Sequence, residues 1–212
     1  PIAGATGATL ALLGVTSADT GTYAVTVTND CGEATASALI DVSNPPVITV
    51  GCDDQTVCAG DDVTFAITAT GTAPLAYSWT KNGVTLPGET GSSLTLPATT
   101  LASAGDYTVT VTNGCGTTGA TATLEVEIPP TIVSPPATAT LCLGNDLTLT
   151  VGATGTGPFT FEWTLNGALI TGATGATYTH AGVTTTDAGT YSVTVSNDCG
   201  DATATAEIEV IL

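Results

Sequence analysis

The chain has almost no positive charge. Lys81 is its only Lys or Arg, whereas 19 of its 212 residues are Asp or Glu, and the formal net charge is -18 at pH 7. Phosphate recognition depends on Lys and Arg, so this composition argues against nucleic acid and against an anionic membrane surface as partners. We interpret the acidic residues as a source of solubility.

Long apolar runs and typical helix formers are also scarce. The longest apolar stretches, such as residues 8–15, are far shorter than the ~20 residues that a membrane-spanning helix needs. Met is absent, whereas Thr is the most frequent residue. Because Thr and Val favour the pleated, half-buried surface of strands, we expect an all-β protein.

Motifs that carry catalysis are missing as well. The sequence has no nucleophile elbow, no phosphate-binding loop and only one His, His180. That His stands where the other repeats have Leu12 and Leu96, so we interpret it as a variant of a core or rim position. The Gly-rich segments 4–7 and 172–175 indicate loops, because no helix follows them. We therefore expect no enzyme activity, no catalytic residue and no cofactor.

The most informative positive feature is a repeat with one constant interval. The interval from Tyr23 to Tyr107 recurs from Tyr107 to Tyr191, and it also separates equivalent tryptophans and cysteines: Trp79 and Trp163; Cys31, Cys115 and Cys199; Cys58 and Cys142. A fixed interval of this kind indicates tandem copies of one structural unit. A unit copied at fixed length is typical of spacers and binding modules rather than of enzymes.

Proline pairs punctuate the repeats and predict the domain boundaries. Pro45-Pro46 and Pro129-Pro130 mark linkers, which predicts domains over 44–127 and 128–212 after a partial domain over 1–43. Pro1 aligns with Leu169, so the partial domain retains only the last three strands expected for a repeat. We expect the sequence to be an excerpt of a longer protein, with the missing strands supplied either by the preceding chain or by another subunit.

The second repeat shows the strand pattern most clearly. Val63, Phe65 and Ile67 alternate with polar residues, as in a strand with one buried face. Asn82-Gly83 is a strong tight-turn pair, and further short strands are expected at 94–96, 107–113 and 121–126. Short strands at this spacing are typical of an antiparallel β-sandwich.

The residues around the tyrosines resemble a known family. The motif Asp-x-Gly-x-Tyr occurs at 19–23 and at 187–191, and the second repeat keeps Gly105 and Tyr107 but has Ser103 in place of Asp. This pattern resembles immunoglobulin-like domains of the intermediate type. The resemblance implies a tyrosine corner at Tyr23, Tyr107 and Tyr191 and sandwich cores around Trp79 and Trp163.

The cysteines depart from that family's usual pattern. The inter-sheet disulfide would join positions that are here Ile67 and Val109, or Val151 and Val193. The cysteines lie instead before the A′–B turn and in the F–G hairpin. This variant resembles the tandem immunoglobulin-like repeats of very large secreted bacterial surface proteins, which implies an extracellular or cell-surface location.

Six cysteines in periodic register predict disulfides and an oxidising compartment. In the implied fold the A′–B turn and the F–G hairpin lie at opposite ends of a sandwich, tens of ångströms apart, which a disulfide cannot span. We therefore predict an interdomain bond from Cys58 to Cys199. Cys31 and Cys115 would pair upstream and Cys142 beyond Leu212. A scheme within each domain, Cys58–Cys115 and Cys142–Cys199, fits the spacing equally well, and Cys52 is left over, either as a thiol or as a cross-link.

Metal sites have weak sequence support. Zinc is disfavoured because the cysteines are not closely paired and His180 is alone. Asp61 and Asp62 are weak candidates for interdomain calcium, but the third repeat has Asn145-Asp146 there and no EF-hand ladder exists. A solvated turn is the preferred interpretation of this pair.

Two functions remain for a repeat of this kind. The leading hypothesis is a structural repeat of an extracellular fibre or adhesin stalk, a rod of disulfide-stiffened domains whose partners are neighbouring repeats or copies of itself. The alternative is an adhesion module that binds a surface glycan or protein through its hairpin loops.

Overall fold

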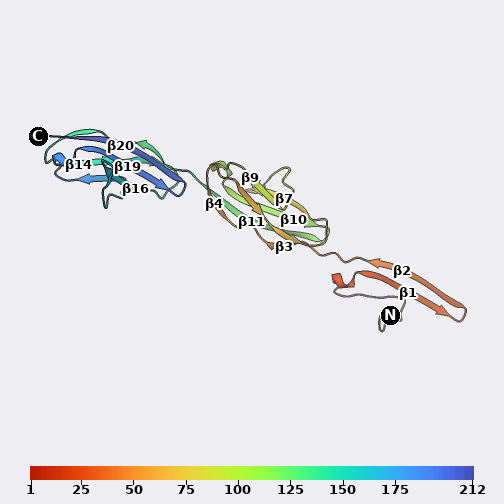
Figure 1. The fold of residues 1–212 in the computed structure, drawn as a ribbon. Coiled ribbons are helices and arrows are strands. Elements are labelled where there is room, and N and C mark those ends of the chain that lie inside the picture. Colours follow the sequence, from red (N-terminus) through yellow and green to blue (C-terminus); the bar gives the residue numbers. More distant parts are fainter. The chain divides into compact units, whose positions relative to one another are not determined.

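The computed structural model describes all residues, 1–212, and the fold is all-β, as the composition predicts (Figure 1). Two β-sandwiches follow a hairpin segment along the chain. Besides the strands there are only three short 3-10 turns, Ser17–Asp19 (η1), Leu101–Ser103 (η2) and Thr185–Asp187 (η3). No helix has the length and apolar character that crossing a membrane requires.

The middle domain contains a five-stranded sheet of order β4-β11-β10-β7-β8 and two strand pairs, β3–β6 and β5–β9. The strands of the large sheet are Gln55–Cys58 (β4), Ala76–Lys81 (β7), Val84–Thr85 (β8), Gly105–Asn113 (β10) and Gly116–Glu127 (β11). The paired strands are Val47–Val50 (β3), Val63–Ala66 (β5), Thr68–Thr70 (β6) and Ser93–Leu96 (β9).

The C-terminal domain repeats this topology, with a sheet of order β13-β20-β19-β16-β17 and the pairs β12–β15 and β14–β18. The large sheet consists of Ala139–Cys142 (β13), Thr160–Leu165 (β16), Ala168–Leu169 (β17), Gly189–Asn197 (β19) and Gly200–Ile211 (β20). The pairs are formed by Thr131–Ser134 (β12), Leu147–Thr150 (β14), Gly152–Thr154 (β15) and Thr177–His180 (β18).

The alternation of Thr with apolar residues explains why these segments are strands with one buried face. Along β19, Tyr191, Val193 and Val195 are buried, whereas the polar residues between them face outward. Outward hydroxyls pair across strands, as between Thr194 and Thr203, whose Oγ1 atoms lie 3.3 Å apart. On the large sheets the valines thus face the core and the threonines face the solvent.

The two edges of the large sheet are formed in the same way in both intact domains. At one edge β4 pairs in parallel with β11, and β13 pairs in parallel with β20. At the other edge β8 and β17 are only two residues long. A very short edge strand offers little backbone for pairing with another chain, which compensates for the scarcity of Lys.

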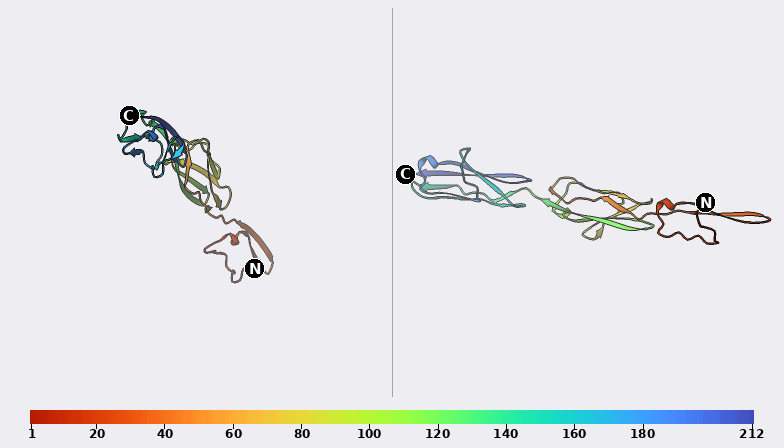
Figure 2. Two further views of the ribbon diagram at one scale, coloured as in Figure 1. Left: turned by 60° about the vertical axis from the view of Figure 1, so that its left-hand side comes forward. Right: turned by 90° about the horizontal axis from the view of Figure 1, so that it is seen from below.

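The N-terminal segment has only one hairpin, formed by Gly21–Asn29 (β1) and Gly32–Ile40 (β2). Residues 9–12, where the repeat predicts strand E, form no strand. The equivalent strands β9 and β18 pair with β5 and β14, and this segment has no such partner. Figure 2 shows the irregular segment 1–16 running beside the hairpin.

The consequence is an exposed sheet face. Val25 and Val27 are 51% and 66% exposed. The residues at the same repeat positions are fully buried: Val109, Val111, Val193 and Val195. The hairpin thus has the pattern of a sandwich whose second layer is absent from residues 1–43.

Candidate functional site

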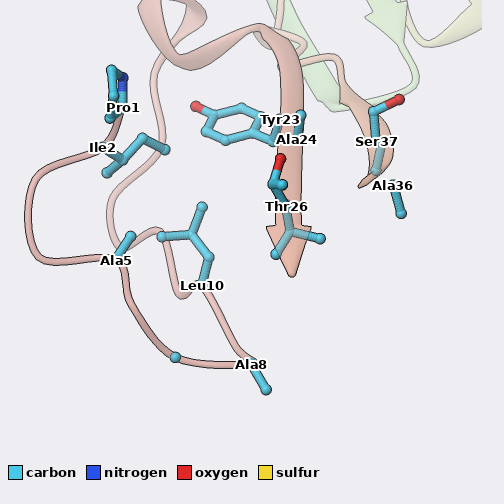
Figure 3. A pocket seen from close by; sticks show the side chains of 13 residues that line it. Pro1, Ile2, Ala5, Ala8, Leu10, Tyr23, Ala24, Thr26, Ala36 and Ser37 are labelled. Atoms are coloured by element: carbon cyan, nitrogen blue, oxygen red, sulfur yellow. The ribbon is translucent and has the colours of Figure 1, made fainter. Parts of the chain in front are cut away.

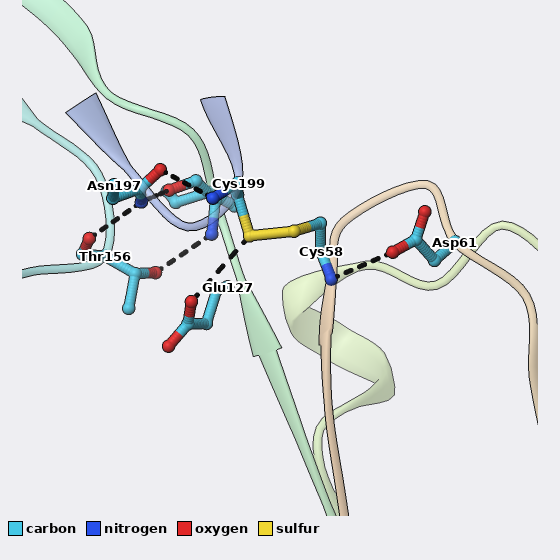
Figure 4. The surroundings of a disulfide bond; sticks show 7 residues. Cys58, Asp61, Glu127, Thr156, Asn197 and Cys199 are labelled. Atoms are coloured by element: carbon cyan, nitrogen blue, oxygen red, sulfur yellow. Dashed lines mark hydrogen bonds between the residues drawn. A yellow bond between two sulfur atoms is a disulfide. The ribbon is translucent and has the colours of Figure 1, made fainter. Parts of the chain in front are cut away.

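Cys58 and Cys199 form a disulfide across 141 residues of sequence, with their Cα atoms 5.4 Å apart (Figure 4). Cys58 is the last residue of β4 in the middle domain, and Cys199 lies in the turn between β19 and β20 of the C-terminal domain. This is the interdomain bond that the implied fold predicts. It excludes the scheme in which Cys58 pairs with Cys115 and Cys142 pairs with Cys199.

The turn that carries Cys58 is held by backbone hydrogen bonds. The amide of Ala59 donates to the carbonyl oxygen of Glu127 at 2.7 Å, and the amide of Gly60 donates to that of Thr99 at 2.7 Å. A side-chain oxygen of Asp61 accepts from the amide of Cys58 at 3.2 Å (Figure 4). The cysteine therefore sits on a fixed turn rather than on a loose loop.

The turn that carries Cys199 is anchored by Asn197. Its side-chain oxygen accepts from the amide of Cys199 at 3.0 Å, and its Nδ2 donates to the carbonyl oxygens of Ile128 and Thr156 at 2.8 and 2.9 Å. The same amide group thus fixes the cysteine turn, the linker residue and the neighbouring loop. This role is not among the sequence predictions, although the motif Asn-x-Cys-Gly occurs once in each repeat and marks it.

Glu127 lies against the disulfide. Its Oε2 is 3.7 Å from Sγ of Cys199. A disulfide sulfur has no proton to donate, so this contact places a carboxylate beside the bond rather than forming a hydrogen bond. With Asp61 beside Cys58 and Asp198 next to Cys199, the surroundings of the bond are acidic.

Each remaining cysteine of the repeat lies in a turn like one of the two turns of the bonded pair, and we call such a turn a half-site. Cys142 ends β13, and the amide of Leu143 donates to the carbonyl oxygen of Ile211 at 2.8 Å, as Ala59 does to Glu127. The amides of Cys31 and Cys115 each donate to the Asn side chain two residues before them at 2.9 Å. Cys31, Cys115 and Cys142 are exposed thiols, whereas Cys52 is half-buried in the loop before β4.

The candidate calcium ligands serve as backbone acceptors in the structure. Asp61 accepts from Cys58, and Oδ1 of Asp62 accepts from the amide of Ala98 at 2.8 Å. Asp146, at the position of Asp62, accepts from Gly182 at 3.0 Å. No group of three or more His, Cys, Asp or Glu side chains is placed to hold a metal ion. The observed role of the pair is to cap a turn.

His180 lies on β18, and its Nε2 is 3.5 Å from a carboxylate oxygen of Asp187. Its ring also stacks on Tyr178, with centroids 6.5 Å apart. The side-chain and backbone hydrogen bonds from Thr184 hold the pKa of Asp187 below its usual range, with a smaller contribution from His180. This arrangement connects η3 to β18.

The tryptophans and tyrosines occupy the structural positions that the family resemblance implies. Trp79 and Trp163 are fully buried, and each indole Nε1 donates at 2.9 Å to a backbone carbonyl oxygen, of Gly91 and Gly175 respectively. Each tyrosine hydroxyl donates to the carbonyl oxygen four residues before it: Tyr23 at 2.9 Å, Tyr107 at 2.8 Å and Tyr191 at 3.0 Å.

A hollow opens on the uncovered face of the β1–β2 hairpin. The segment 1–10 loops back so that Ile2 and Leu10 lie on the side of Tyr23 (Figure 3). Val25 and Ala36 continue the lining along the two strands. Its walls are mainly small and aliphatic side chains, with Tyr23 as the aromatic one, so the hollow offers a largely apolar surface.

Comparison with known proteins agrees with this architecture. The family model described as "Immunoglobulin domain" matches residues 45–113 and 129–197. A fragment of titin, domains I67–I69, superposes with a TM-score of 0.74 at 22% identity, covering 93% of this chain and 77% of that one.

Curated relatives are large animal proteins. The basement membrane-specific heparan sulfate proteoglycan core protein of Mus musculus is 30% identical over 215 residues, which cover 96% of this chain and 6% of that protein. Roundabout homolog 1 of Rattus norvegicus is 31% identical over 238 residues, covering 95% of this chain and 14% of that protein. The chain thus spans a small part of each relative, and these relatives are not the bacterial surface proteins that the cysteine pattern resembles.

Each matched segment lies within one of the two sandwiches and ends before its last strand, and together the two segments make up more than half of the chain. The buried tryptophans, the tyrosine corners and the two-layer topology are shared by the two copies. The chain belongs to the immunoglobulin domain family.

Proposed function

We propose that the chain is a structural segment of an extracellular fibre or adhesin stalk, in which disulfides between consecutive immunoglobulin-like domains limit bending. The observation that supports this most directly is the bond from Cys58 of one domain to Cys199 of the next. A linker alone leaves neighbouring domains free to move, which is the usual behaviour of small interdomain contacts. A second covalent connection removes much of that freedom.

The repetition of the half-sites supports the same function. Cys142 has the repeat position of Cys58, and Cys115 and Cys31 have the repeat position of Cys199. Every repeat therefore carries residues for the same connection to a neighbour. An oxidising, extracellular setting is the compartment in which such bonds persist.

The parent protein is proposed to be a large secreted surface protein. The similarity to the basement membrane-specific heparan sulfate proteoglycan core protein supports this setting. A bacterial source stays a prediction that depends on the turn position of the cysteines, since the relatives named above are animal proteins.

Small-angle X-ray scattering tests the stalk function. The chain is compared with the double variant Cys58→Ser/Cys199→Ser, which keeps the linker and both domains. We expect the variant to sample a wider range of interdomain arrangements, with a broader distance distribution. Cys115→Ser is the matched control and should leave the distribution unchanged. Equal distributions for the chain and the double variant would contradict a stiffening role.

The alternative, an adhesion module that binds a glycan or protein, has one observation in its favour, the apolar face of the β1–β2 hairpin. The same face is buried in both intact domains, so an incomplete sandwich accounts for it without a ligand. Binding of the chain to a glycan array, retained when Val25 is replaced by a residue that leaves the hairpin folded, would favour recognition through the loops instead.

A further inference from the structure

We propose that Glu127 protects the bond between Cys58 and Cys199 against reduction by negatively charged thiols. Its carboxylate repels the attacking thiolate and destabilises the thiolate that leaves. The molecules kept out are anionic low-molecular-weight thiols, of which glutathione is one. This inference concerns the lifetime of the bond and does not depend on whether the bond stiffens the joint.

Strand register places Glu127 beside the bond. Glu127 is the last residue of β11 and lies directly opposite Cys58 in the parallel pair with β4. Two steps earlier, Oγ1 of Thr56 donates to Oε2 of Glu125 at 3.4 Å, so side chains opposite each other meet on this outward side of the sheet. The carbonyl oxygen of Glu127 also accepts from the amide of Ala59 at 2.7 Å, which fixes its main chain at the turn.

The side chain of Glu127 reaches the second cysteine as well. Its Oε2 lies 3.7 Å from Sγ of Cys199 (Figure 4). The carboxylate therefore contacts one sulfur of the bond and lies opposite the residue that carries the other. A charge in this position acts on both sulfurs.

Burial alone does not protect the bond. Cys58 and Cys199 are both half-buried, so a small thiol has access to the sulfurs. At an accessible disulfide, the rate of reduction depends on how readily a thiolate approaches and on how readily a cysteine thiolate leaves. Local charge influences both steps.

The other charges near the bond have the same sign. A side-chain oxygen of Asp61 accepts from the amide of Cys58, and Asp198 precedes Cys199 in the chain. The only Lys, Lys81, lies on β7, and β10 separates β7 from β11 in the sheet. The neighbouring acidic residues thus reinforce the field of the carboxylate.

The carboxylate opposes reduction by either route. Attack at Sγ of Cys199 brings the negative reagent against Glu127 and releases the Cys58 thiolate opposite it. Attack at Sγ of Cys58 releases the Cys199 thiolate beside the same carboxylate. A second reagent thiolate then attacks the reagent sulfur of the mixed disulfide and expels the other cysteine. Two reagent thiols are oxidised to one disulfide, the protein disulfide is reduced, and the two cysteine thiolates take up the protons that the reagent thiols released.

The C-terminal domain shows that the fold does not require this charge. Ile211 has the repeat position of Glu127 and lies opposite Cys142 in the pair of β13 with β20. Asn145 has the repeat position of Asp61. The strand pair therefore accommodates an uncharged residue, and Glu127→Ile copies an arrangement that the chain already contains.

The test compares thiols whose thiolate forms differ in charge. Cysteamine has an ammonium group that balances its thiolate, mercaptoethanol has no further charge, and mercaptopropionate adds a carboxylate. For each thiol, the rate for a variant is divided by the rate for the unmodified chain, so the intrinsic reactivity of the thiol cancels. Glu127→Gln and Glu127→Ile should raise the rate severalfold with mercaptopropionate, less with mercaptoethanol and least with cysteamine.

Peptide mapping follows this one bond. The exposed thiols are first blocked with iodoacetamide, and reduction is stopped at intervals by further alkylation. Cleavage after Glu gives peptide 34–89, with Cys58, linked to peptide 163–207, with Cys199. Neither peptide contains residue 127, so the decay of the linked pair is measured in the same way for every variant.

Glu209→Gln is the matched control because it removes the same charge at a distance. Glu209 lies near the end of β20, whereas Cys199 precedes the first residue of that strand, a separation of ~30 Å at ~3.3 Å per residue. This variant should leave all three rates unchanged. At about 1 M salt, where the Debye length is about 3 Å, the differences among the thiols for Glu127→Gln should become much smaller.

The charge series separates electrostatic protection from a loosened turn. A substitution that only loosens the end of β11 would speed reduction by the three thiols to the same extent. Equal rate ratios for the three thiols, or the same ratios for Glu127→Gln and Glu209→Gln, would overturn the proposal.

Discussion

The hydroxyl of Tyr191 donates a hydrogen bond of 3.0 Å to the carbonyl oxygen of Asp187, which joins the start of β19 to η3. The same bond occurs at Tyr107 and Ser103 in the middle domain and at Tyr23 and Asp19 in the N-terminal segment. It persists in the N-terminal segment although the second layer is missing there. The tyrosine corner thus forms locally, from the strand that carries the tyrosine (β1, β10 or β19) and the turn before it.

Tyr191→Phe should destabilise the C-terminal domain by about 1 kcal/mol, the usual net value of a hydrogen bond whose acceptor stays in place. Urea unfolding followed by tryptophan fluorescence measures this change. Tyr23→Phe, in a hairpin with an exposed face, is the control and should leave the unfolding of both sandwiches unaltered.

The same tyrosine predicts a loss of stability at alkaline pH. Burial, followed by the negative charges of Tyr178 and Asp187, raises the pKa of Tyr191 from 10.0 to about 12. A folded pKa above the unfolded one gives stability that is complete below pH 10 and is lost as the pH rises towards 12. Thermal unfolding across this range should show a smaller decrease for Tyr191→Phe than for the unmodified chain.

The lowered pKa of Asp187 predicts a loss of stability at acid pH. Hydrogen bonds from Thr184 lower its pKa, so its contribution is present above the unfolded value near 3.8 and is lost as the pH falls through the lower folded value. Ser103 holds the same position in the middle domain and accepts from the amide of Thr100 at 3.1 Å without titrating in this range.

Hydrogen exchange of the whole chain, followed by mass spectrometry, separates the two domains. When the pH falls from 5 to below the folded pKa of Asp187, the amides of the turn 184–188 should lose more protection against exchange than those of the equivalent turn 100–104. The comparison is made after correction for the intrinsic exchange rates. Asp187→Ser, which copies the middle domain, should remove the difference. Equal behaviour of the two turns in the unmodified chain would contradict this assignment.

Trp163→Ala should cost the C-terminal domain ~3–5 kcal/mol, the range observed when a large buried aromatic side chain is removed from a core. The indole is fully buried, and its Nε1 donates to the carbonyl oxygen of Gly175, so the variant loses packing and a hydrogen bond together. Guanidinium unfolding, followed by circular dichroism, measures the loss. Leu169→Ala, at a position 60% exposed, should change stability by less than ~0.5 kcal/mol.

Gly155→Ala should destabilise the C-terminal domain more than Gly172→Ala. Both glycines have positive φ, +142 and +88, which L side chains rarely adopt. A Cβ at Gly155 would lie 2.8 Å from the carbonyl oxygen of Pro129, whereas nothing lies within 4 Å at Gly172. We expect about 1–2 kcal/mol of backbone strain at Gly172 and an added steric cost at Gly155, measured as a difference in unfolding midpoint. Equal midpoints would show that the linker moves away without penalty.

Much of the fold was predictable because it depends on local sequence pattern. Alternation of Thr and Val defines strands such as β19, and the buried side is marked by the same residues in each repeat. The tyrosine corner spans four residues, so its motif is visible in the sequence. The constant interval between repeats means that whatever one repeat forms, the next repeat can form as well.

The roles of side chains that act across the sequence were not predictable. Asn197 reaches Ile128 and Thr156, 69 and 41 residues away, and its motif Asn-x-Cys-Gly does not say which distant carbonyl oxygens the side chain contacts. Asp61 and Asp62 have a composition that fits a cation site, yet their oxygens are used by the backbone amides of Cys58 and Ala98. The repeat also predicts a strand over residues 9–12, which does not form because a strand needs a partner for its backbone.

Periodicity and side-chain type are enough to specify the all-β class, the repeat, the buried aromatic residues and the equivalence of the cysteines. They do not specify which cysteines are joined, because equal spacing allows a pairing within domains as readily as one between them. The bond between Cys58 and Cys199 requires two turns, 141 residues apart in the chain, to bring their Cα atoms within 5.4 Å. That proximity arises from the meeting of two folded domains, and no segment of the sequence contains it.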